Sequence, residues 1–399
     1  MRSGQFVRQV EGYRAFIPAP SPPANPPLQF DAEFLHLLTE ADRNLGRLDG
    51  VASILPDPNL FVAMYVRQEA VLSSQIEGTQ STLEDVLQFE IDAKGDDRPK
   101  DVEEVVNYVG AMNHGLNRMR ELPLSKRLIR EIHEKLLAGV RGSNKEPGEF
   151  RRSQNWIGPA GCTLATATFV PPPPAEMNHA LDDLERFLHD EAQLILVHCG
   201  LVHAQFETIH PFLDGNGRVG RLLITFLLCQ RGVLQRPLLY LSQFLKRNRA
   251  EYYDRLTAVR ERGEWEAWLK FFLRGIGEVS REATETARRI TALREKDRVA
   301  LQSNVSNPAA LTLLDRLYEQ PICTAKMAEE WLDCSYSTAN KMIGQFVKAG
   351  LLREMTGFGR NRRYAYDPYL ALFPSSTRPH TDGIPAQTTI SNLPSDPPA

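Results

Sequence analysis

The segment from His210 to Arg221 holds the residues that are most able to do chemistry. It reads HPFLDGNGRVGR and lies between two apolar stretches that we expect to be helices. The start of a helix exposes backbone amides, and Gly215 and Gly217 let that backbone approach a ligand closely. The pattern therefore predicts an anion-binding site at the start of the second helix.

The side chains of this segment supply the other groups that phosphate chemistry needs. Arg218 and Arg221 lie three residues apart, so both can clamp phosphate oxygens from one side of the helix. Asp214 suits a Mg²⁺ ion that bridges phosphates, and Asn216 can donate a hydrogen bond to the same anion. His210 can take up a proton near neutral pH. Together these residues predict a site that handles a nucleotide.

This segment also resembles the core motif of the Fic family, HPFx(D/E)GNGRxxR, at every defined position, and the resemblance extends through residues 30–275. It implies a mainly α fold, with a Fic helical core and a small β-hairpin flap. It also implies a protein adenylyltransferase, which moves AMP from ATP to Tyr, Thr or Ser hydroxyls of proteins. In the related Doc branch a larger residue and a lysine fill the loop and the γ-phosphate is transferred, so Gly215 and Gly217 favour AMP transfer.

The resemblance implies a role for each motif residue. His210 would be the catalytic base, and Asp214 would hold Mg²⁺. The implied ATP contacts are Gly215, Asn216, Gly217, Arg218, Gly220 and Arg221, with Asn248 and Tyr252 on the adenine side. Tyrosines at helical spacing are often core residues, so the adenine-side contacts have a structural alternative.

The segment Ser73–Gly78 resembles the (S/T)xxxE(G/N) inhibitory motif of many Fic proteins. Its position before the core implies an N-terminally autoinhibited class, in which Glu77 pairs with Arg221 and fills the γ-phosphate position. A glutamate near a glycine-capped helix end can also be an ordinary solvated residue. A further alternative is the removal of AMP from modified proteins, with Glu77 orienting a water.

Residues 147–174 break the helical pattern. Their glycines, β-branched residues and proline tetrad predict a hairpin, with one limb near Phe150–Ile157 and a return limb over Thr168–Val170. The resemblance makes this hairpin the flap that binds a target segment by strand addition. The implied target-binding residues are Asn155, Trp156, Ile157 and Gly158. The alternative is a hairpin that only covers the core.

The chain divides into segments of different composition. We expect an extended Pro-rich N-terminus over 1–30, a helical region with the inhibitory helix over 31–100, a Fic core over 101–277, a connecting, solvent-exposed helix over 278–306, a winged helix over 307–370 and a disordered tail over 371–399.

The winged helix is predicted from two helices, a turn, a third helix and a hairpin. Basic residues gather on its third helix and wing, so residues 336–363 could contact DNA. The alternative is a module for dimerisation or for presenting a protein substrate. A second functional hypothesis follows, in which the chain is a DNA-binding regulator that uses the Fic core as a nucleotide sensor.

The composition bounds the class of protein. The 399 residues carry a net charge of −3, with 42% hydrophobic and 24% charged residues, which excludes wholesale disorder and a global basic field. We expect no membrane contact, because no apolar run reaches the ~20 residues of a membrane-spanning helix. Five scattered cysteines predict reduced thiols and a cytoplasmic location. The expected partner is a protein with a hydroxyl side chain; self-modification and a homodimer stay open.

Overall fold

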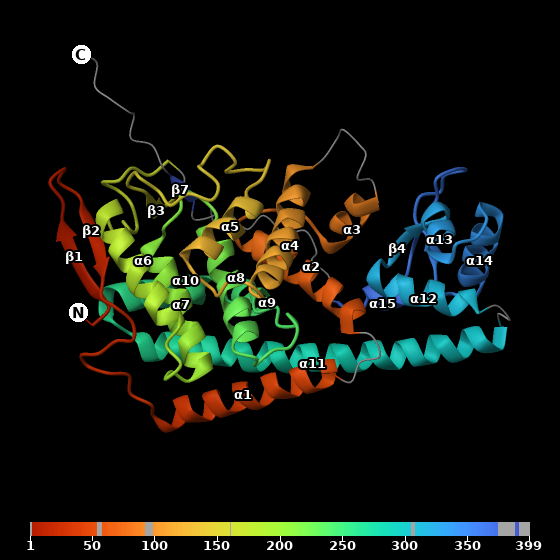
Figure 1. The fold of residues 1–399 in the computed structure, drawn as a ribbon, viewed down its shortest axis with the longest axis horizontal. Helices are drawn as coiled ribbons and strands as arrows, with labels where there is room; N and C mark the ends of the chain where they lie inside the picture. Colours follow the sequence, from red (N-terminus) through yellow and green to blue (C-terminus); the bar gives the residue numbers. More distant parts are fainter. Residues whose placement is uncertain are drawn as a thin grey trace, which may run out of the picture.

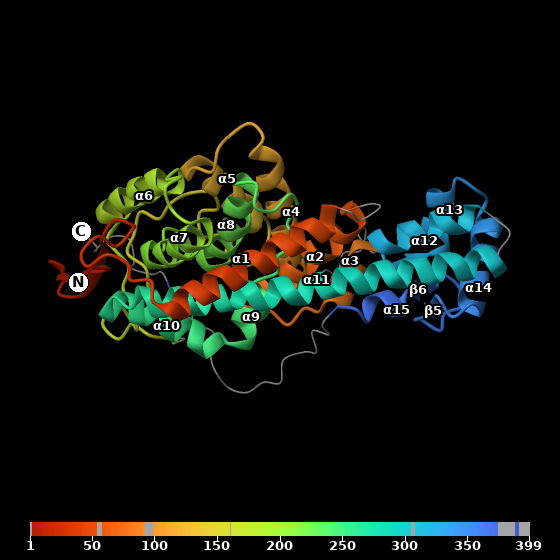
Figure 2. The same ribbon diagram turned by 90° about the horizontal axis from the view of Figure 1, so that it is seen from below.

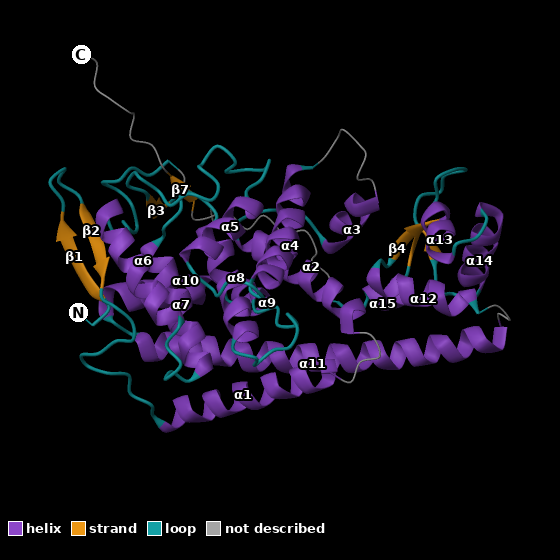
Figure 3. Cartoon of the chain, viewed as in Figure 1, coloured by secondary structure: helices purple, strands orange, loops and turns teal. Residues whose placement is uncertain are grey.

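The computed structural model describes residues 2–53, 58–91, 99–159, 161–304, 308–373 and 388–390. These residues are mainly helical, with three small antiparallel sheets (Figures 1 and 3), as the sequence predicts. The helices are α1 (Ala32–Ser53), α2 (Pro58–Ile76), α3 (Leu83–Ile91), α4 (Lys100–Arg118), α5 (Lys126–Leu136), α6 (Pro174–Leu188), α7 (Ile195–Ile209), α8 (Asn216–Gln230), α9 (Ser242–Arg247), α10 (Arg249–Arg262), α11 (Trp265–Asn304), α12 (Ala309–Glu319), α13 (Ala325–Leu332), α14 (Tyr336–Lys348) and α15 (Asp367–Leu370). The strands are β1 (Gly4–Arg8), β2 (Arg14–Pro18), β3 (Trp156–Gly158), β4 (Ile322–Thr324), β5 (Arg353–Glu354), β6 (Arg363–Ala365) and β7 (Thr388–Ile390).

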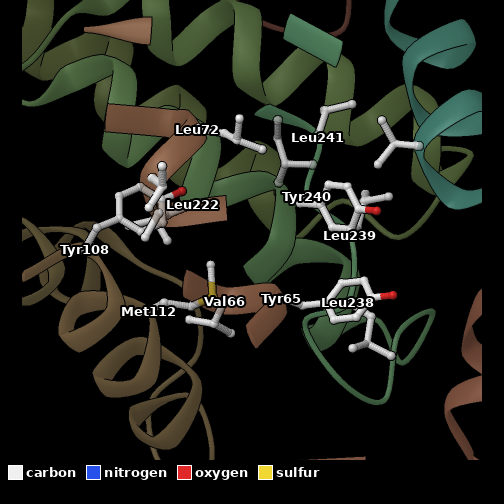
Figure 4. Close-up of a cluster of buried hydrophobic side chains, with 14 of the residues drawn as sticks. Tyr65, Val66, Leu72, Tyr108, Met112, Leu222, Leu238, Leu239, Tyr240 and Leu241 are labelled. Atoms are coloured by element: carbon white, nitrogen blue, oxygen red, sulfur yellow. The ribbon is translucent and has the colours of Figure 1, made fainter. Parts of the chain in front are cut away.

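Helices α7 and α8 form the centre of the core. Every residue of α7 from Leu196 to Ile209 is buried, as is typical of a helix with apolar side chains all round. Helices α2 and α4 pack against each other and against α8. Groups on α2 and α4 are therefore held close to the start of α8, where the motif lies. Figure 4 shows part of this shared core, with the side chains Tyr65, Val66, Leu72, Tyr108, Met112, Leu222, Leu238, Leu239, Tyr240 and Leu241 labelled.

Helix α11 runs along most of the molecule, and α1 lies beside it in both views (Figures 1 and 2). The helix expected over 278–306 is the second part of α11, which is continuous from Trp265 to Asn304; residues 305 and 306 lie outside the described residues. This part of α11 is not fully exposed, since Val279, Ala283 and Ile290 are buried at helical spacing. The many charged residues around this narrow apolar stripe explain the mistaken expectation. No helix in the described ranges is long and apolar enough to span a bilayer.

The sequence predicts an extended N-terminus, but the structure forms a hairpin there. Strands β1 and β2 pair as an antiparallel hairpin, and the Phe16 amide donates to the Val170 carbonyl at 2.9 Å. The Phe16 ring is buried with Ile157 and Phe169, on either side of the predicted flap. The contact joins segments about 150 residues apart, which short-range patterns cannot reveal.

The expected flap hairpin is reduced to a short strand and one bridge. Strand β3 covers only Trp156–Gly158, and a single antiparallel bridge joins Ile157 to Phe169 in place of a return strand. Pro171–Pro174 follow at once and cannot donate ladder hydrogen bonds. Ala160, in the predicted turn, lies outside the described residues. The other partner of β3 is β7, from the far end of the chain.

Helices α12–α14 and the sheet β4-β6-β5 lie beside the C-terminal part of α11 (Figure 1), which α12 and α15 contact. Arg294 of α11 donates to Asp315 of α12 at 2.8 Å, and the Tyr366 hydroxyl hydrogen-bonds Asp297 of α11. The polar tail expected over 371–399 lies largely outside the described residues. Within it the structure describes residues 371–373, a turn, and strand β7.

Candidate active site

The backbone around the motif changes direction twice. Helix α7 ends where His210 adopts a left-handed conformation, with φ 49°, and Pro211 follows it. Gly215, with φ 77°, then caps the start of α8. This conformation strains residues that carry a Cβ, so glycine is the natural residue there. One pocket results, and it is lined by Glu77, Arg141, Ile157, Glu207, His210, Asp214, Gly215, Asn216, Gly217, Arg218, Arg221, Tyr252 and Tyr253.

His210 is a buried, neutral imidazole. The residue is 5% exposed, and its ring hydrogen-bonds the backbone of Glu207, one turn earlier on α7. Burial, together with the positive charges of Arg260 and Arg151, lowers the pKa of His210 to about 3. The ring is therefore uncharged at neutral pH, which is the form that can accept a proton.

A buried network holds the motif loop in place. The Arg151 Nε donates to the His210 carbonyl at 3.0 Å. The Asn155 amide donates to the carbonyls of His210, at 3.3 Å, and Phe212, at 2.9 Å. Asn155 is fully buried and its side chain supports the motif loop; its contact with a target stays a prediction.

The Asn216 side chain also serves the loop. Its Oδ1 accepts from the Phe212 amide at 2.9 Å, and its Nδ2 donates to the Phe212 carbonyl at 2.8 Å. Asn216 lines the pocket, but these bonds occupy its amide oxygen and one of its two N–H groups. Its expected role as an anion donor is thus reduced to the second N–H group.

Asp214 is a suitable ligand for Mg²⁺. Its carboxylate lines the pocket, is 32% exposed and accepts from the Gly215 amide at 2.6 Å. A Cβ at Gly142 would lie 3.0 Å from Asp214 Oδ2, so the glycine leaves room for this carboxylate. The described residues contain no group of three or more candidate metal ligands among His, Cys, Asp and Glu. A single carboxylate fits Mg²⁺, which is commonly bound by one or two carboxylates, substrate phosphates and water.

Arg218 is 1% exposed and is already paired with a carboxylate that the sequence analysis missed. Its Nη1 donates to Glu104 Oε2, in α4, at 3.0 Å, and its Nη2 lies 3.4 Å from Asp214. Glu104 also pairs with Arg141 of the pocket, at 3.3 Å. Glu104 stands more than 100 residues before the motif and matches no pattern, so sequence spacing gives no signal for it.

Arg221 contacts the two residues of the expected inhibitory motif. Its Nε donates to Ser73 Oγ at 2.8 Å, and its Nη2 donates to Glu77 Oε1 at 2.7 Å. Burial alone would raise the pKa of Glu77, but Arg221 outweighs it and holds that pKa below its usual range. A Cβ at Gly217 would lie 2.3 Å from Glu77 Oε1, so the carboxylate rests against the start of α8. The structure thus brings Ser73, Glu77 and Arg221 together.

Glu207 is a second acid in the pocket that the sequence analysis missed. The residue is 7% exposed, its Oε1 has no hydrogen-bond partner, and a Cβ at Gly220 would lie 2.7 Å from that atom. Gly220 therefore makes room for Glu207 and is not itself among the pocket-lining residues. Burial raises the pKa of Glu207 to about 7, with Arg221 opposing the shift and Glu77 adding to it. Its place one helical turn before His210 is the only sequence signal for it.

The two residues expected on the adenine side, Tyr252 and Asn248, have different positions relative to the pocket. Tyr252 and Tyr253 line the pocket, and the Tyr252 hydroxyl hydrogen-bonds His203 Nε2 at 2.8 Å. Asn248 is not among the lining residues; its amide donates to the Phe244 carbonyl at 3.0 Å and caps α9. The ATP contact of Asn248 therefore stays a prediction, and its side chain caps α9 in this conformation.

The remaining flap residues have distinct positions. Trp156 is buried with Ala15 and Val170, and its Nε1 donates to the Cys162 carbonyl at 3.1 Å. Ile157 lines the pocket beside His210. Gly158 lies against Cys162, where a Cβ would be only 2.6 Å from its Sγ. Strand β3 thus forms one rim of the pocket.

Comparisons with known proteins agree with this architecture. Residues 35–117 match the Fic/DOC family N-terminal profile, and residues 123–228 match the Fic/DOC family profile. The chain contains a Fic N-terminal domain followed by a Fic domain, and the family resemblance is confirmed.

Named relatives are adenylyltransferases. A probable protein adenylyltransferase of Aquifex aeolicus is 28% identical over 54% of this chain and 60% of its own length. The protein adenylyltransferase Fic of Aedes aegypti is 34% identical over 36% of this chain and 26% of its own length. This chain spans less than two thirds of either relative. The crystal structure of a Fic family protein from Desulfovibrio desulfuricans G20 shares the fold, with a TM-score of 0.54 at 20% identity over 85% of this chain and 97% of that one.

Proposed function

We propose that the protein is an adenylyltransferase that transfers AMP from ATP to a Tyr, Thr or Ser hydroxyl of a protein. The observation that carries this proposal is the pocket itself, which combines one neutral base, His210, with a helix start and the arginine Arg221. A helix start and a guanidinium together favour bound phosphates. The names of the relatives point to the same activity.

In this proposal His210 accepts the proton of the target hydroxyl as its oxygen attacks the α-phosphorus. The bond from that phosphorus to the bridging oxygen breaks, and pyrophosphate leaves. The negative charge of bound phosphates would raise the pKa of His210 from about 3 towards neutral, which makes it a better base in the complex. Mg²⁺ at Asp214 would supply positive charge beside the phosphates.

We further propose that the described conformation is autoinhibited. The Glu77 carboxylate lies against Gly217 at the start of α8 and bonds Arg221, so it occupies groups that would otherwise bind phosphate. The Gly217 contact requires the absence of a side chain, which ties the glycine of the motif to the inhibitory glutamate. ATP would have to displace Glu77 from Arg221 to bind productively.

The division of the chain into functional segments is also a proposal. Helices α12–α14 with the sheet β4-β6-β5 support a winged helix over 307–370. A second candidate function, DNA binding by this segment, is favoured by the exposure of Ser337, Asn340, Lys341 and Arg362. The hydroxyls of Ser335 and Thr338 are less available for contacts with DNA, because they bond each other at 2.9 Å and Ser335 caps α14.

Removal of AMP at the same site is a third candidate. Glu77 and Glu207 both line the pocket with His210, and a carboxylate there could orient a water. Glu77 bonds Arg221 in this conformation, so it would have to orient the water while it holds the guanidinium.

Label transfer tests the proposal. The Glu77→Gly protein, with Mg²⁺, should take covalent label from α-labelled ATP but none from γ-labelled ATP. His210→Ala in the same protein should reduce the rate about 10²–10⁴-fold, the usual contribution of a general base. Label from γ-labelled ATP would instead indicate phosphate transfer. A salt-dependent DNA shift by an unlabelled protein would support the regulator.

A further inference from the structure

Glu207 is a buried acid inside a pocket whose other features favour anions. Its side chain lines the pocket together with the start of α8 and Arg221, and the residue is 7% exposed. Among the described residues its Oε1 has no hydrogen-bond partner. A buried carboxylate without a partner costs free energy when it is ionised, and a phosphate bound beside it would add repulsion. The acid therefore needs either a partner or a proton when the pocket holds a nucleotide.

Two arginines lie near this acid, but each bonds other groups. Arg221 of α8 donates from Nη2 to Glu77 Oε1 at 2.7 Å. Arg260 of α10 donates from Nη2 to the backbone carbonyl of Glu207 at 3.1 Å. The positive charges of both arginines favour the ionised form of Glu207, but within the described residues neither guanidinium bonds its Oε1. The arginines therefore do not remove the need for a proton.

The other groups around Glu207 are uncharged at neutral pH or negative. Burial lowers the pKa of His203 to about 4, and the ring bonds the Gly220 carbonyl at 3.0 Å and the Tyr252 hydroxyl at 2.8 Å. Burial raises the pKa of Glu207 itself to about 7, and the charge of Glu77 adds to this shift. The titratable and charged groups that face Glu207 are Glu77 after α2, His203 of α7, His210 after α7, Arg221 of α8, and Tyr252, Tyr253 and Arg260 of α10. Glu207 is thus poised between its neutral and charged forms.

Two glycines of α8 place the acid next to the expected phosphate position. A Cβ at Gly217 would lie 2.3 Å from Glu77 Oε1, and a Cβ at Gly220 would lie 2.7 Å from Glu207 Oε1. The two carboxylates therefore rest against the same helix at positions three residues apart, a rise of about 4.5 Å. A phosphate that displaced Glu77 from Arg221 would have Glu207 as its neighbour along α8.

We propose that Glu207 binds the nucleotide as a neutral carboxylic acid, whose O–H donates a hydrogen bond to a phosphate oxygen. This inference rests on the proposed function, because it takes ATP as the ligand. A carboxylate can only accept hydrogen bonds, whereas the protonated acid has one donor. A bond from that O–H to a charged oxygen is short and strong. The charge of bound phosphates raises the pKa of Glu207 further, so ATP binding takes up one proton from solvent, which stays on the carboxyl oxygen.

Titration calorimetry with ATP and Mg²⁺ tests the inference in the full-length protein that carries Glu77→Gly and His210→Ala. These two changes prevent turnover and remove two other groups that could take up a proton. Comparing buffers of different ionisation enthalpy at about pH 8 should show the uptake of about one proton for each ATP bound. Above neutral pH the affinity for ATP should fall about tenfold per pH unit, because the free protein must first be protonated.

Adding Glu207→Gln to this protein should abolish both effects. The glutamine amide is a permanent donor, so ATP should bind without proton uptake and with an affinity that does not depend on pH. At about pH 8.5 this variant should therefore bind ATP roughly tenfold more tightly than the protein that keeps Glu207. Damage to the fold would weaken binding at every pH instead.

Glu69→Gln is the matched control. Glu69 is 4% exposed and burial raises its pKa to about 7, but it is not among the residues that line the pocket, and it accepts from the Ser242 amide at 3.1 Å. Proton uptake should persist in this variant. ATP binding without proton uptake, or uptake that persists in Glu207→Gln, would overturn this inference and leave the proposed function intact. Failure of all these proteins to bind ATP would contradict the proposed function itself.

Discussion

Two buried arginines at the start of α8 are each held by a glutamate, one on α4 and one directly after α2, but the two contacts differ. Arg218 pairs with Glu104, whose side chain is 2% exposed. Arg221 pairs with Glu77, whose side chain is 24% exposed and lines the pocket. The same pair of residue types is therefore closed to solvent in one place and open to the pocket in the other. We propose that only the contact that is open to the pocket can be displaced by a ligand and so can regulate.

The largest expected effect is on stability, at Glu104. Glu104→Ala would leave the Arg218 guanidinium buried without its closest carboxylate, and breaking a buried pair in this way costs about 3–5 kcal/mol. Urea denaturation should show this loss in the free energy of unfolding. Glu103→Ala, next to it on α4 but less buried, is the control, with an expected change below ~1 kcal/mol. Equal effects of the two substitutions would refute the distinction.

The next effect is on nucleotide binding, at Glu77. Glu77→Gly removes the anion that competes with ATP for Arg221. A hydrogen bond between charged groups contributes about 1.5–3 kcal/mol, so ATP affinity should rise roughly tenfold to a hundredfold. Calorimetry in a His210→Ala background would measure binding without turnover. Glu77→Gln keeps the shape and loses the charge, and it should give a smaller gain. Unchanged affinity in both variants would show that Glu77 does not compete with ATP.

The pKa values of Glu77 and Glu104 should also be shifted in opposite directions. The pKa of Glu77 lies below its ordinary 4.5, so its stabilising contribution is present above 4.5 and is lost as the pH falls through the folded-state value. Burial raises the pKa of Glu104, and the attraction of Arg218 and Arg141 only partly offsets it. Its contribution is therefore present below 4.5 and is lost as the pH rises through its folded-state value. Carboxyl NMR titration of the two residues checks this order; a lower pKa at Glu104 than at Glu77 would reverse it.

The smallest effect is expected at Ser73. Ser73→Ala removes one acceptor from Arg221 Nε, while the Ser73 carbonyl, at 3.1 Å from Nη2, and Glu77 still hold the guanidinium. One hydrogen bond of this kind contributes about 1–2 kcal/mol. The thermal unfolding midpoint of this variant should lie below that of wild type and above that of Glu104→Ala. A loss as large as that of Glu104→Ala would mean that both arginine contacts are structural.

The sequence predicted the parts of the site that lie close together along the chain. His210, Asp214, Gly217 and Arg221 fall within one loop and one helix turn, where spacing determines placement. The contact of Glu77 with Arg221 was anticipated only because a family motif supplied it. The structure confirms that these two side chains meet, while their inhibitory role remains a proposal.

The features of the fold and the site that the sequence did not predict depend mostly on contacts between distant segments. Glu104 reaches Arg218 across 114 positions, and Phe16 reaches Val170 across the hairpin and flap, with no periodic signal at either end. The sequence did not predict that the side chains of Asn155 and Asn248 bond backbone carbonyls, because a polar residue near a site can equally satisfy backbone groups. The continuity of α11 was missed because charged residues conceal its narrow buried stripe.

The most direct measurement of the central claim is the intact mass of wild type and Glu77→Gly after incubation with ATP and Mg²⁺. We predict a gain of ~329 Da per AMP in Glu77→Gly and little or none in wild type. The reason is that in wild type Glu77 engages Arg221, which should otherwise bind the phosphates. Equal gains in the two proteins would contradict autoinhibition by Glu77. A gain of ~80 Da, one phosphate, would contradict adenylyl transfer itself.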